Sequence, residues 1–321
     1  MQITRGVQKT AIKTVIYGSE GIGKSTLASK FPDALFIDTE DSTTHMDVAR
    51  FDKPTSWTDI LDKIEYVRKH PDICKTLVID TADSAERMCI EELCTKMGWN
   101  GLEGAGYGRG YQYLAEEFSK MLKKLSEVIK AGIHVVLTAH AAMRKFEQPD
   151  EMGAYDRWEM KLQKKTAPLV KEWADMVLFC NYKTTVVNVD GQGAQKGKNK
   201  VFGGERVMYT SHHNCWDAKN RFGLESPLPM EFGSIAALFG DIPKPAPKWQ
   251  VLKEKMETDN VEEFDLQNLV GAKQWASAMD PIENYSHELI DFLLGDWEKV
   301  KAVIKENKEK EEIPFNKEDK E

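Results

Sequence analysis

The sequence has few cysteines and no long hydrophobic run, and both facts narrow the class of protein. The five cysteines are an odd number and contain no C-x-x-C pair, so we expect a reduced chain without a disulfide framework. No apolar stretch approaches the roughly 20 residues that span a bilayer, so we expect no membrane helix. The segment Met1–Arg5 is not followed by an apolar region, and we expect no secretory signal.

An overall excess of positive charge, common in nucleic-acid-binding proteins, is also missing. The formal net charge is −8 over 321 residues. Residues 251–321 hold 10 Lys and Arg against 19 Asp and Glu, a net charge of −9, which leaves +1 for residues 1–250. The acidic bias therefore belongs to the C-terminal region, and a basic surface on the rest of the chain remains compatible with the sequence.

What the sequence does have is a pattern of short apolar runs that alternate with helical periodicity. Strands separated by helices predict βαβ units and a mainly parallel sheet flanked by helices, an α/β fold. The expected strands are Thr14–Tyr17, Ala34–Ile37, Thr76–Ile79, His134–Thr138 and Met176–Cys180. The expected helices are Lys24–Lys30, Trp57–Lys69, Ser84–Met97, Tyr111–Ile129 and Thr166–Trp173.

The alternation ends before a proline-rich segment, which divides the chain. We expect a core over 1–242, a stiff linker over 243–249 with three alternate prolines, and an acidic helical extension over 250–321. Thr184–Val189 and Val201–Ser211 predict a β extension of the core. Asp259–Ala278 and Glu288–Lys305 predict a small helical appendage, and residues 306–321 a disordered tail.

The clearest motif is G-x-x-x-x-G-K-[ST], between an expected strand and an expected helix. Glycines let the backbone wrap closely and direct several N–H groups at phosphate oxygens. Lys24 would contact the β- and γ-phosphates of ATP, and the Ser25 hydroxyl would bind Mg²⁺. The expected nucleotide-binding residues are Gly18, Ser19, Glu20, Gly21, Ile22, Gly23, Lys24, Ser25 and Thr26.

Two further strands end in carboxylates, at the sheet edge where ligands of open α/β sheets bind. Asp80 ends the run L-V-I-D, which is typical of a residue that orders the metal ion. The run F-I-D-T-E ends in Glu40, a candidate to orient or deprotonate the attacking water. Asp38 and Asp41 remain alternatives for that role.

The order of these motifs resembles the RecA-type recombinase core: P-loop, F-I-D-T-E, L-V-I-D, then a fourth strand that ends in a polar residue. The resemblance implies that Glu40 activates water, and that the polar residue after the fourth strand senses the γ-phosphate. That residue is His140 here, where recombinases usually have glutamine. The resemblance thus gives Glu40, Lys24 and His140 as catalytic residues.

A narrower resemblance rests on Y-G-R-G-Y at Tyr107–Tyr111 and A-K-N-R at Ala218–Arg221. With the core they resemble phage-encoded RecA-like single-strand-annealing ATPases over about residues 10–235. The resemblance implies a DNA-stimulated ATPase that binds single-stranded DNA and promotes annealing or homologous recombination. It also implies a homo-oligomer, ring or filament, in the host bacterial cytoplasm, with Lys219 and Arg221 as candidates to reach a neighbouring subunit's γ-phosphate.

Two segments combine aromatic and basic residues, which suits a single strand because bases stack on rings and phosphates pair with cations. They are Gly98–Tyr111 and Met143–Lys165, where the resemblance places two DNA loops. The alternative is that the rings pack in the core. The candidate nucleic-acid-binding residues are Arg109, Arg144, Lys145, Arg157, Trp158 and Lys161.

Other functions remain compatible with these motifs. One is a phage replication ATPase of the helicase-loader type, which acts through a protein partner. A nucleotide kinase and a switch that binds ATP without hydrolysing it are further alternatives. The acidic tail is a candidate to recruit a single-strand-binding or replication protein.

Overall fold

The structure is a computed structural model that describes residues 5–6, 8–147, 153–188, 199–240 and 248–311. The chain divides into two compact units, Met1–Pro243 and Lys244–Glu321. Most of the expected linker and the end of the expected tail lie outside the described residues. Within the described part of the chain, no helix is both long and apolar enough to cross a membrane.

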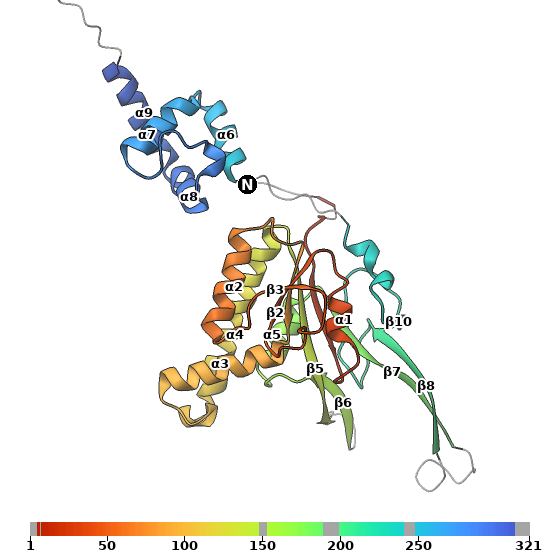
Figure 1. Ribbon diagram of the computed structural model, residues 1–321. Helices are drawn as coiled ribbons and strands as arrows, with labels where there is room; N and C mark the ends of the chain where they lie inside the picture. The colour runs from red at the N-terminus through yellow and green to blue at the C-terminus, as the bar shows by residue number, and fades with distance from the viewer. Residues whose placement is uncertain (1–4, 7, 148–152, 189–198, 241–247, 312–321) are drawn as a thin grey trace, which may run out of the picture. The chain divides into compact units, whose positions relative to one another are not determined.

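The first unit is built on a mostly parallel sheet with antiparallel additions, which confirms the expected α/β fold class (Figure 1). Its strands are ordered β10-β8-β7-β1-β5-β4-β2-β3, with β6 paired to β5 and β9 to β7. The parallel strands are β1 (Lys13–Gly18), β2 (Ala34–Asp38), β3 (Ala49–Arg50), β4 (Thr76–Asp80), β5 (His134–Glu147) and β7 (Met176–Asn188). The antiparallel strands are β6 (Ala154–Met160), β8 (Asn199–Tyr209), β9 (Lys219–Asn220) and β10 (Leu228–Pro229).

Two strands run well beyond their expected ends. The sequence predicts a loop over Met143–Lys165, but β5 continues to Glu147 and pairs antiparallel with β6, from Ala141 opposite Met160 to Glu147 opposite Ala154. In the same way β7 continues past Cys180 and pairs with β8. Figure 1 shows both hairpins extending from the same edge of the sheet. The β7–β8 hairpin agrees with the β extension expected over Thr184–Val189 and Val201–Ser211. The polar composition of β6 and of the end of β5 concealed the other hairpin, because a hairpin outside the core needs no buried face.

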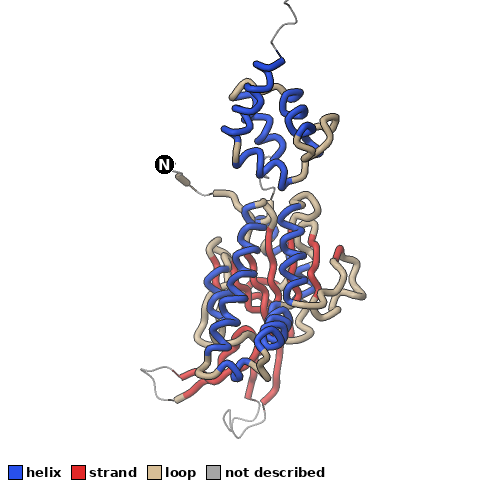
Figure 2. Tube along the Cα trace, turned by 90° about the vertical axis from the view of Figure 1, so that its left-hand side faces the viewer, coloured by secondary structure: helices blue, strands red, loops and turns tan. Residues whose placement is uncertain are grey.

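Helices cover both faces of the sheet because strand side chains alternate between them. Val15 and Tyr17 face one hydrophobic cluster, and Ile16 faces the other. The first cluster packs under four helices, α2 (Trp57–Lys69), α3 (Ala82–Met97), α4 (Arg109–Lys130) and α5 (Thr166–Trp173). The second packs under α1 (Lys24–Ala28) and the 3-10 turns η2 (Phe232–Ser234) and η3 (Ala236–Leu238). Figure 2 shows the long helices as a layer beside the strands.

The second unit is helical, with its own buried core around Leu252, Leu266 and Leu293. This confirms the expected small helical appendage, although neither Asp259–Ala278 nor Glu288–Lys305 is one continuous helix. The chain forms α6 (Lys248–Thr258), α7 (Glu263–Ala272), a 3-10 turn η4 (Ile282–Asn284), α8 (His287–Gly295) and α9 (Trp297–Glu311). The break between α8 and α9 falls at Asp296, which directly follows Gly295, a residue that favours a helix end. The indole nitrogen of Trp297 then donates to Asp259, 2.6 Å away.

The core of the first unit gives a stability test. Phe118 on α4 is fully buried and stacks on Trp57, with ring centroids 5.7 Å apart. Phe118→Ala should lower the free energy of unfolding by about 3–5 kcal/mol, because it removes buried apolar area and leaves a cavity. Urea unfolding followed by circular dichroism measures the change. The control is Gln112→Ala on the exposed face of the same helix, expected to change stability by about 0.5 kcal/mol or less. An equal effect of the two substitutions would contradict this packing.

Candidate functional site

The loop between β1 and α1 is shaped by its glycines. A Cβ on Gly18 would lie 2.3 Å from the backbone oxygen of Cys180, so only glycine fits beside β7. Gly21 and Gly23 have φ angles of 71° and 105°, which favour glycine. A backbone that turns this tightly leaves its N–H groups available to an anion, as a triphosphate requires.

Lys24 begins α1 and is buried at the base of the loop. Its Nζ donates to the backbone oxygens of Gly18 at 3.2 Å and Ser19 at 2.9 Å. Burial lowers the pKa of Lys24, although the carboxylates of Asp80 and Asp83 act in the opposite direction. The loop carbonyls thus hold the Lys24 ammonium group at a position where phosphate oxygens could replace them as hydrogen-bond acceptors.

Asp80 ends β4 and is fully buried. One carboxylate oxygen accepts a hydrogen bond from Thr138 on β5, and the other accepts from Ser42 at 2.7 Å. A carboxylate and a hydroxyl are oxygen ligands of the kind that Mg²⁺ prefers. The donor set at the P-loop therefore fits Mg²⁺, with Ser25 and Asp80 as the residues that would hold it, directly or through water.

The loop after β2 separates the three candidate bases. Asp38 accepts from the backbone nitrogens of Glu40, Ser42 and Thr43, at 3.0, 3.2 and 2.7 Å. Burial opposes ionisation of Asp38, but these hydrogen bonds together outweigh it and lower the pKa of the carboxyl. Asp38 therefore acts as the anchor of the loop.

The other two acids of this loop are exposed. Asp41 pairs with Lys53 on the surface. Glu40 lies close to Asp83 and His140, and each of these three residues places one ligand atom within 4.8 Å of the others. Of the three candidate bases, Glu40 is thus the one beside the predicted γ-phosphate sensor.

His140 and Asp83 form a pair at the end of β5. The Nδ1 of His140 lies 2.9 Å from one oxygen of Asp83, and the backbone nitrogen of His140 donates to the other at 2.9 Å. The hydrogen bond to Asp83 raises the pKa of His140, against partial burial. The same bonds outweigh the burial of Asp83 and lower its pKa. The pair therefore favours an imidazolium, which could face a γ-phosphate oxygen.

A cavity of about 740 Å³ opens on this side of the P-loop. Its lining includes Glu20, Glu40, Asp83 and His140 from the nucleotide side, and Arg87, Arg144, Lys161 and Gln163 from α3, β5 and the segment before α5. Glu86 lies in the wall, and burial raises its pKa to about 7. Both of its oxygens accept from the backbone nitrogen of Gln163, at 3.1 and 3.0 Å.

Two of the predicted nucleic-acid-binding residues, Arg157 and Trp158, make contacts inside the protein. Arg157 is 9% exposed, pairs with Asp217 and lies over the ring of Phe146. Trp158 is half-buried and packs against the main core, near Phe179. In this arrangement, neither side chain points outward toward a DNA strand.

The other candidates lie at or near the surface. Lys145 is exposed on β5, and Lys161 is exposed after β6. Arg144 is half-buried and donates to the backbone oxygen of Leu162 at 2.7 Å. Arg109 begins α4, next to Tyr107, whose side chain is fully exposed. The structure brings Arg144 and Lys161 together at the cavity, whereas Arg109 lies at the far end of α3.

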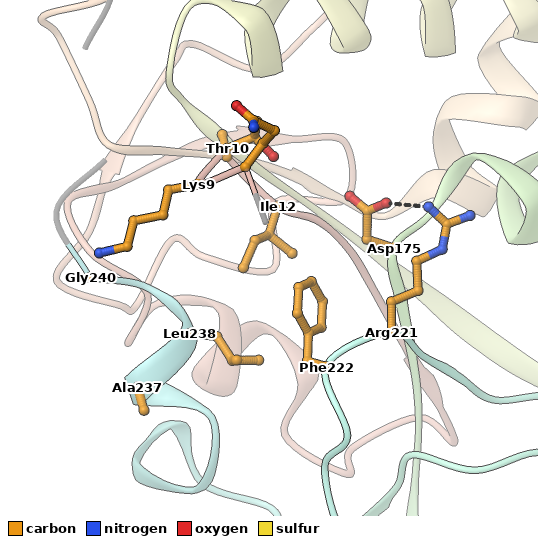
Figure 3. A pocket seen from close by; sticks show the side chains of 11 residues that line it. Lys9, Thr10, Ile12, Asp175, Arg221, Phe222, Ala237, Leu238 and Gly240 are labelled. Carbon is orange, nitrogen blue, oxygen red and sulfur yellow. Dashed lines mark hydrogen bonds and ion pairs between the residues drawn. The ribbon is translucent and has the colours of Figure 1, made fainter. Parts of the chain in front are cut away.

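Lys219 and Arg221 lie at the opposite edge of the sheet from Lys24. β9 pairs with β7 at Met176 and Val177, whereas Gly18 pairs with Cys180, about 10–13 Å further along the strand. Arg221 forms an ion pair with Asp175 at 3.0 Å beside a cavity of about 420 Å³ (Figure 3). Lys219 donates to the backbone oxygens of Lys171 and Glu172. Neither residue can serve the P-loop of its own chain from this position.

Three residues of the site were missed by the sequence analysis: Asp83, Arg87 and Arg206. Arg206 on β8 places its Nη1 3.3 Å from the backbone oxygen of Ile22, against the P-loop. Sequence spacing carries no signal for this contact, because 184 residues separate the partners. Asp83 and Arg87 could have been found from the sequence. They lie four residues apart on the helix that follows L-V-I-D, so they share one helix face near the end of that strand.

Comparisons with known proteins place this chain in a family. None of the curated proteins compared matches the chain. Among solved structures, it is similar to the flagellar accessory protein FlaH from Methanocaldococcus jannaschii, with 9% identity and a TM-score of 0.30 over 74% of this chain and 84% of that one. The model of the AAA domain family matches residues 10–222, about two thirds of the sequence. The chain therefore belongs to the AAA domain family of P-loop ATPases.

Proposed function

We propose that this ATPase binds single-stranded DNA in an ATP-dependent manner and promotes strand annealing or homologous recombination. The observation that carries the proposal is the path of β5. The strand passes Thr138, which contacts Asp80, then His140 beside Glu40, and continues into a hairpin with Arg144 and Lys145. One continuous strand thus links the hydrolysis site to candidate DNA-binding cations.

In the proposed hydrolysis step, Lys24 and the P-loop N–H groups hold the β- and γ-phosphates of ATP. Bound Mg²⁺, held by Ser25 and Asp80, would neutralise phosphate charge. Glu40 orients a water molecule and accepts its proton as the water oxygen bonds to the γ-phosphorus. The bond from that phosphorus to the bridging oxygen breaks, which leaves ADP and phosphate. The His140 imidazolium stabilises the γ-phosphate oxygens.

We propose further that the protein works as a homo-oligomer, because Lys219 and Arg221 lie far from their own P-loop. In such an assembly they would leave their present partners and face a neighbouring subunit's ATP. Single strands would bind through stacking and phosphate contacts and without base readout, so binding should be sequence-tolerant and sensitive to salt.

The test of the proposed function is ATP hydrolysis at fixed moderate salt, with and without a long unstructured oligo(dT). We expect clear stimulation by the oligonucleotide, and weaker stimulation as salt rises. Lys145→Gln on the hairpin should reduce the stimulation. The matched control is Lys120→Gln on the exposed side of α4, which should behave like wild type. Equal rates with and without DNA, together with no DNA binding in a non-hydrolysable ATP analogue, would reject the proposal.

The assignment of the base gives a second prediction. Glu40→Gln should retain ATP binding and lose about 10²- to 10⁴-fold in turnover, because the amide cannot accept the proton. Lys24→Ala should lose nucleotide binding itself, since it removes a charged donor to the phosphates. Single-turnover hydrolysis and equilibrium binding of a fluorescent ATP analogue separate the two effects. Asp41→Asn serves as the control and should turn over normally. A large loss in that variant alone would move the role to Asp41.

The His140–Asp83 pair gives a prediction on pH. Because the folded-state pKa of His140 is raised above its usual value of about 6.5, the pair stabilises the fold most below pH 6.5. That contribution is lost as pH rises through the folded-state pKa. Asp83→Asn should return the pKa of His140 toward 6.5, so the fall in turnover with rising pH should begin at lower pH than in wild type. The pH dependence of turnover and an NMR titration of His140 measure these two effects. Identical pH profiles of wild type and Asp83→Asn would exclude a cationic role for His140.

A further inference from the structure

The cavity beside the candidate hydrolysis site has a basic wall that ATP hydrolysis alone does not explain. Its nucleotide side carries Glu40 and His140, and its opposite side carries Arg87, Arg144 and Lys161. These three cations come from α3, β5 and the segment before α5, which lie far apart in the sequence. The fold therefore gathers them at one place, facing the predicted position of the γ-phosphate.

Two of these cations have no acidic partner among the described residues. Within the described part of the chain, Arg87 donates to the Ser84 hydroxyl at 3.0 Å and forms no ion pair, and Lys161 is exposed without one. Arg144 is different, since it holds the backbone oxygen of Leu162 and lies 3.6 Å from Glu159. Arg87 and Lys161 are thus available to an anion, whereas Arg144 fixes the segment that carries Lys161.

The acids of the same cavity do not cancel this charge. Asp83 is engaged by His140, and Glu20 and Glu40 lie on the nucleotide side. Glu86 is 4% exposed and its carboxylate accepts from the backbone of Gln163. Its raised pKa means that part of its negative charge is lost near neutral pH. The wall formed by Arg87 and Lys161 therefore favours a ligand with negative charge.

We propose that this cavity binds a phosphate group of a second ligand, distinct from ATP, between the side chains of Arg87 and Lys161. The inference rests on the proposed use of the P-loop for ATP. A cavity of about 740 Å³ open to solvent can admit one phosphate of a longer strand. A phosphodiester of single-stranded DNA is the ligand we favour; the phosphate of a mononucleotide that accepts the γ-phosphoryl group has the same chemistry.

The contacts of Lys161 explain how this ligand would act on hydrolysis. The backbone nitrogen of Lys161 donates to the backbone oxygen of His140 at 2.8 Å. The next two residues are held by Arg144 and Glu86. A phosphate drawn to Lys161 therefore acts on the segment bonded directly to His140, and it would favour one position of His140 toward ATP.

The experiment uses the full-length protein with Arg87→Gln, Lys161→Gln and the double variant. ADP release is measured against increasing oligo(dT), and separately against each of the four deoxynucleoside monophosphates, with chromatography to detect a diphosphate product. We expect half-maximal stimulation by oligo(dT) to require about tenfold more DNA in each single variant, and more in the double variant, because each loses a charge-assisted contact. Arg87→Lys should recover part of the loss.

Lys164→Gln is the matched control, since Lys164 is exposed, three residues from Lys161 and outside the cavity. It should respond to oligo(dT) as wild type does. Wild-type stimulation that persists unchanged in the Arg87 and Lys161 variants would overturn the inference and leave the proposed function standing. Phosphorylation of a monophosphate, lost in the same variants, would support the phosphate site and replace the proposed function with a kinase. No response to either ligand in wild type would overturn the inference.

Discussion

Gly18 lies between two parallel strands, opposite His140 on β5 and Cys180 on β7, and this pairing fixes the geometry of the whole site. The register places the start of the P-loop level with His140, where the core part of β5 ends. The pairing of Asp38 with Asp80 likewise places the ends of β2 and β4 level with each other. Four chain segments therefore deliver their chemistry to one sheet edge. The close approach of Gly18 to Cys180 leaves no room for a side chain, so register and loop shape depend on each other.

Electrostatics at this edge follow from which charges are already paired. Lys24 is buried, and its hydrogen-bond partners within the described residues are the neutral carbonyls of Gly18 and Ser19, so a triphosphate would relieve its desolvation. Asp80 is buried but satisfied by two hydroxyls, which keeps it in place beside Lys24. Asp83 is neutralised by His140. Glu40 is not held by contacts of this kind among the described residues, so its carboxylate can orient the attacking water. The division between anchored and available acids is what gives each carboxylate a different role.

Much of this arrangement could be predicted from sequence because it depends on local signals. The P-loop glycines, the apolar strands and the helices Trp57–Lys69 and Thr166–Trp173 are read from short-range patterns, and their bounds agree with the structure. The choice between Asp38 and Glu40 could not be made, because it depends on how Thr43 closes the loop onto Asp38. The ion pair between Arg157 and Asp217 could not be predicted, because the two residues lie sixty positions apart in the sequence. From sequence alone, Arg157 therefore looks available to DNA. Sequence patterns locate side chains on elements, whereas long-range pairing decides which charges remain available.

The extended strands give the site a reach that a compact P-loop domain would lack. β5 carries backbone hydrogen bonds to β1 and β4 in the core and to β6 beyond it, so a shift at His140 cannot be absorbed by a flexible joint. β7 likewise pairs with β1 in the core and with β8 beyond it, although the register of that hairpin shifts between Lys183 and Thr184. Its partner β8 brings Arg206 against the P-loop. Each hairpin thus has one end in contact with the nucleotide site and the other outside the core. The uninterrupted pairing of β5 with β6 would therefore carry a change at the γ-phosphate into that hairpin as one body. This stiffness provides a physical route by which ATP could control the nucleic-acid surface proposed above, and the coupling would operate in both directions because coupling between sites is reciprocal.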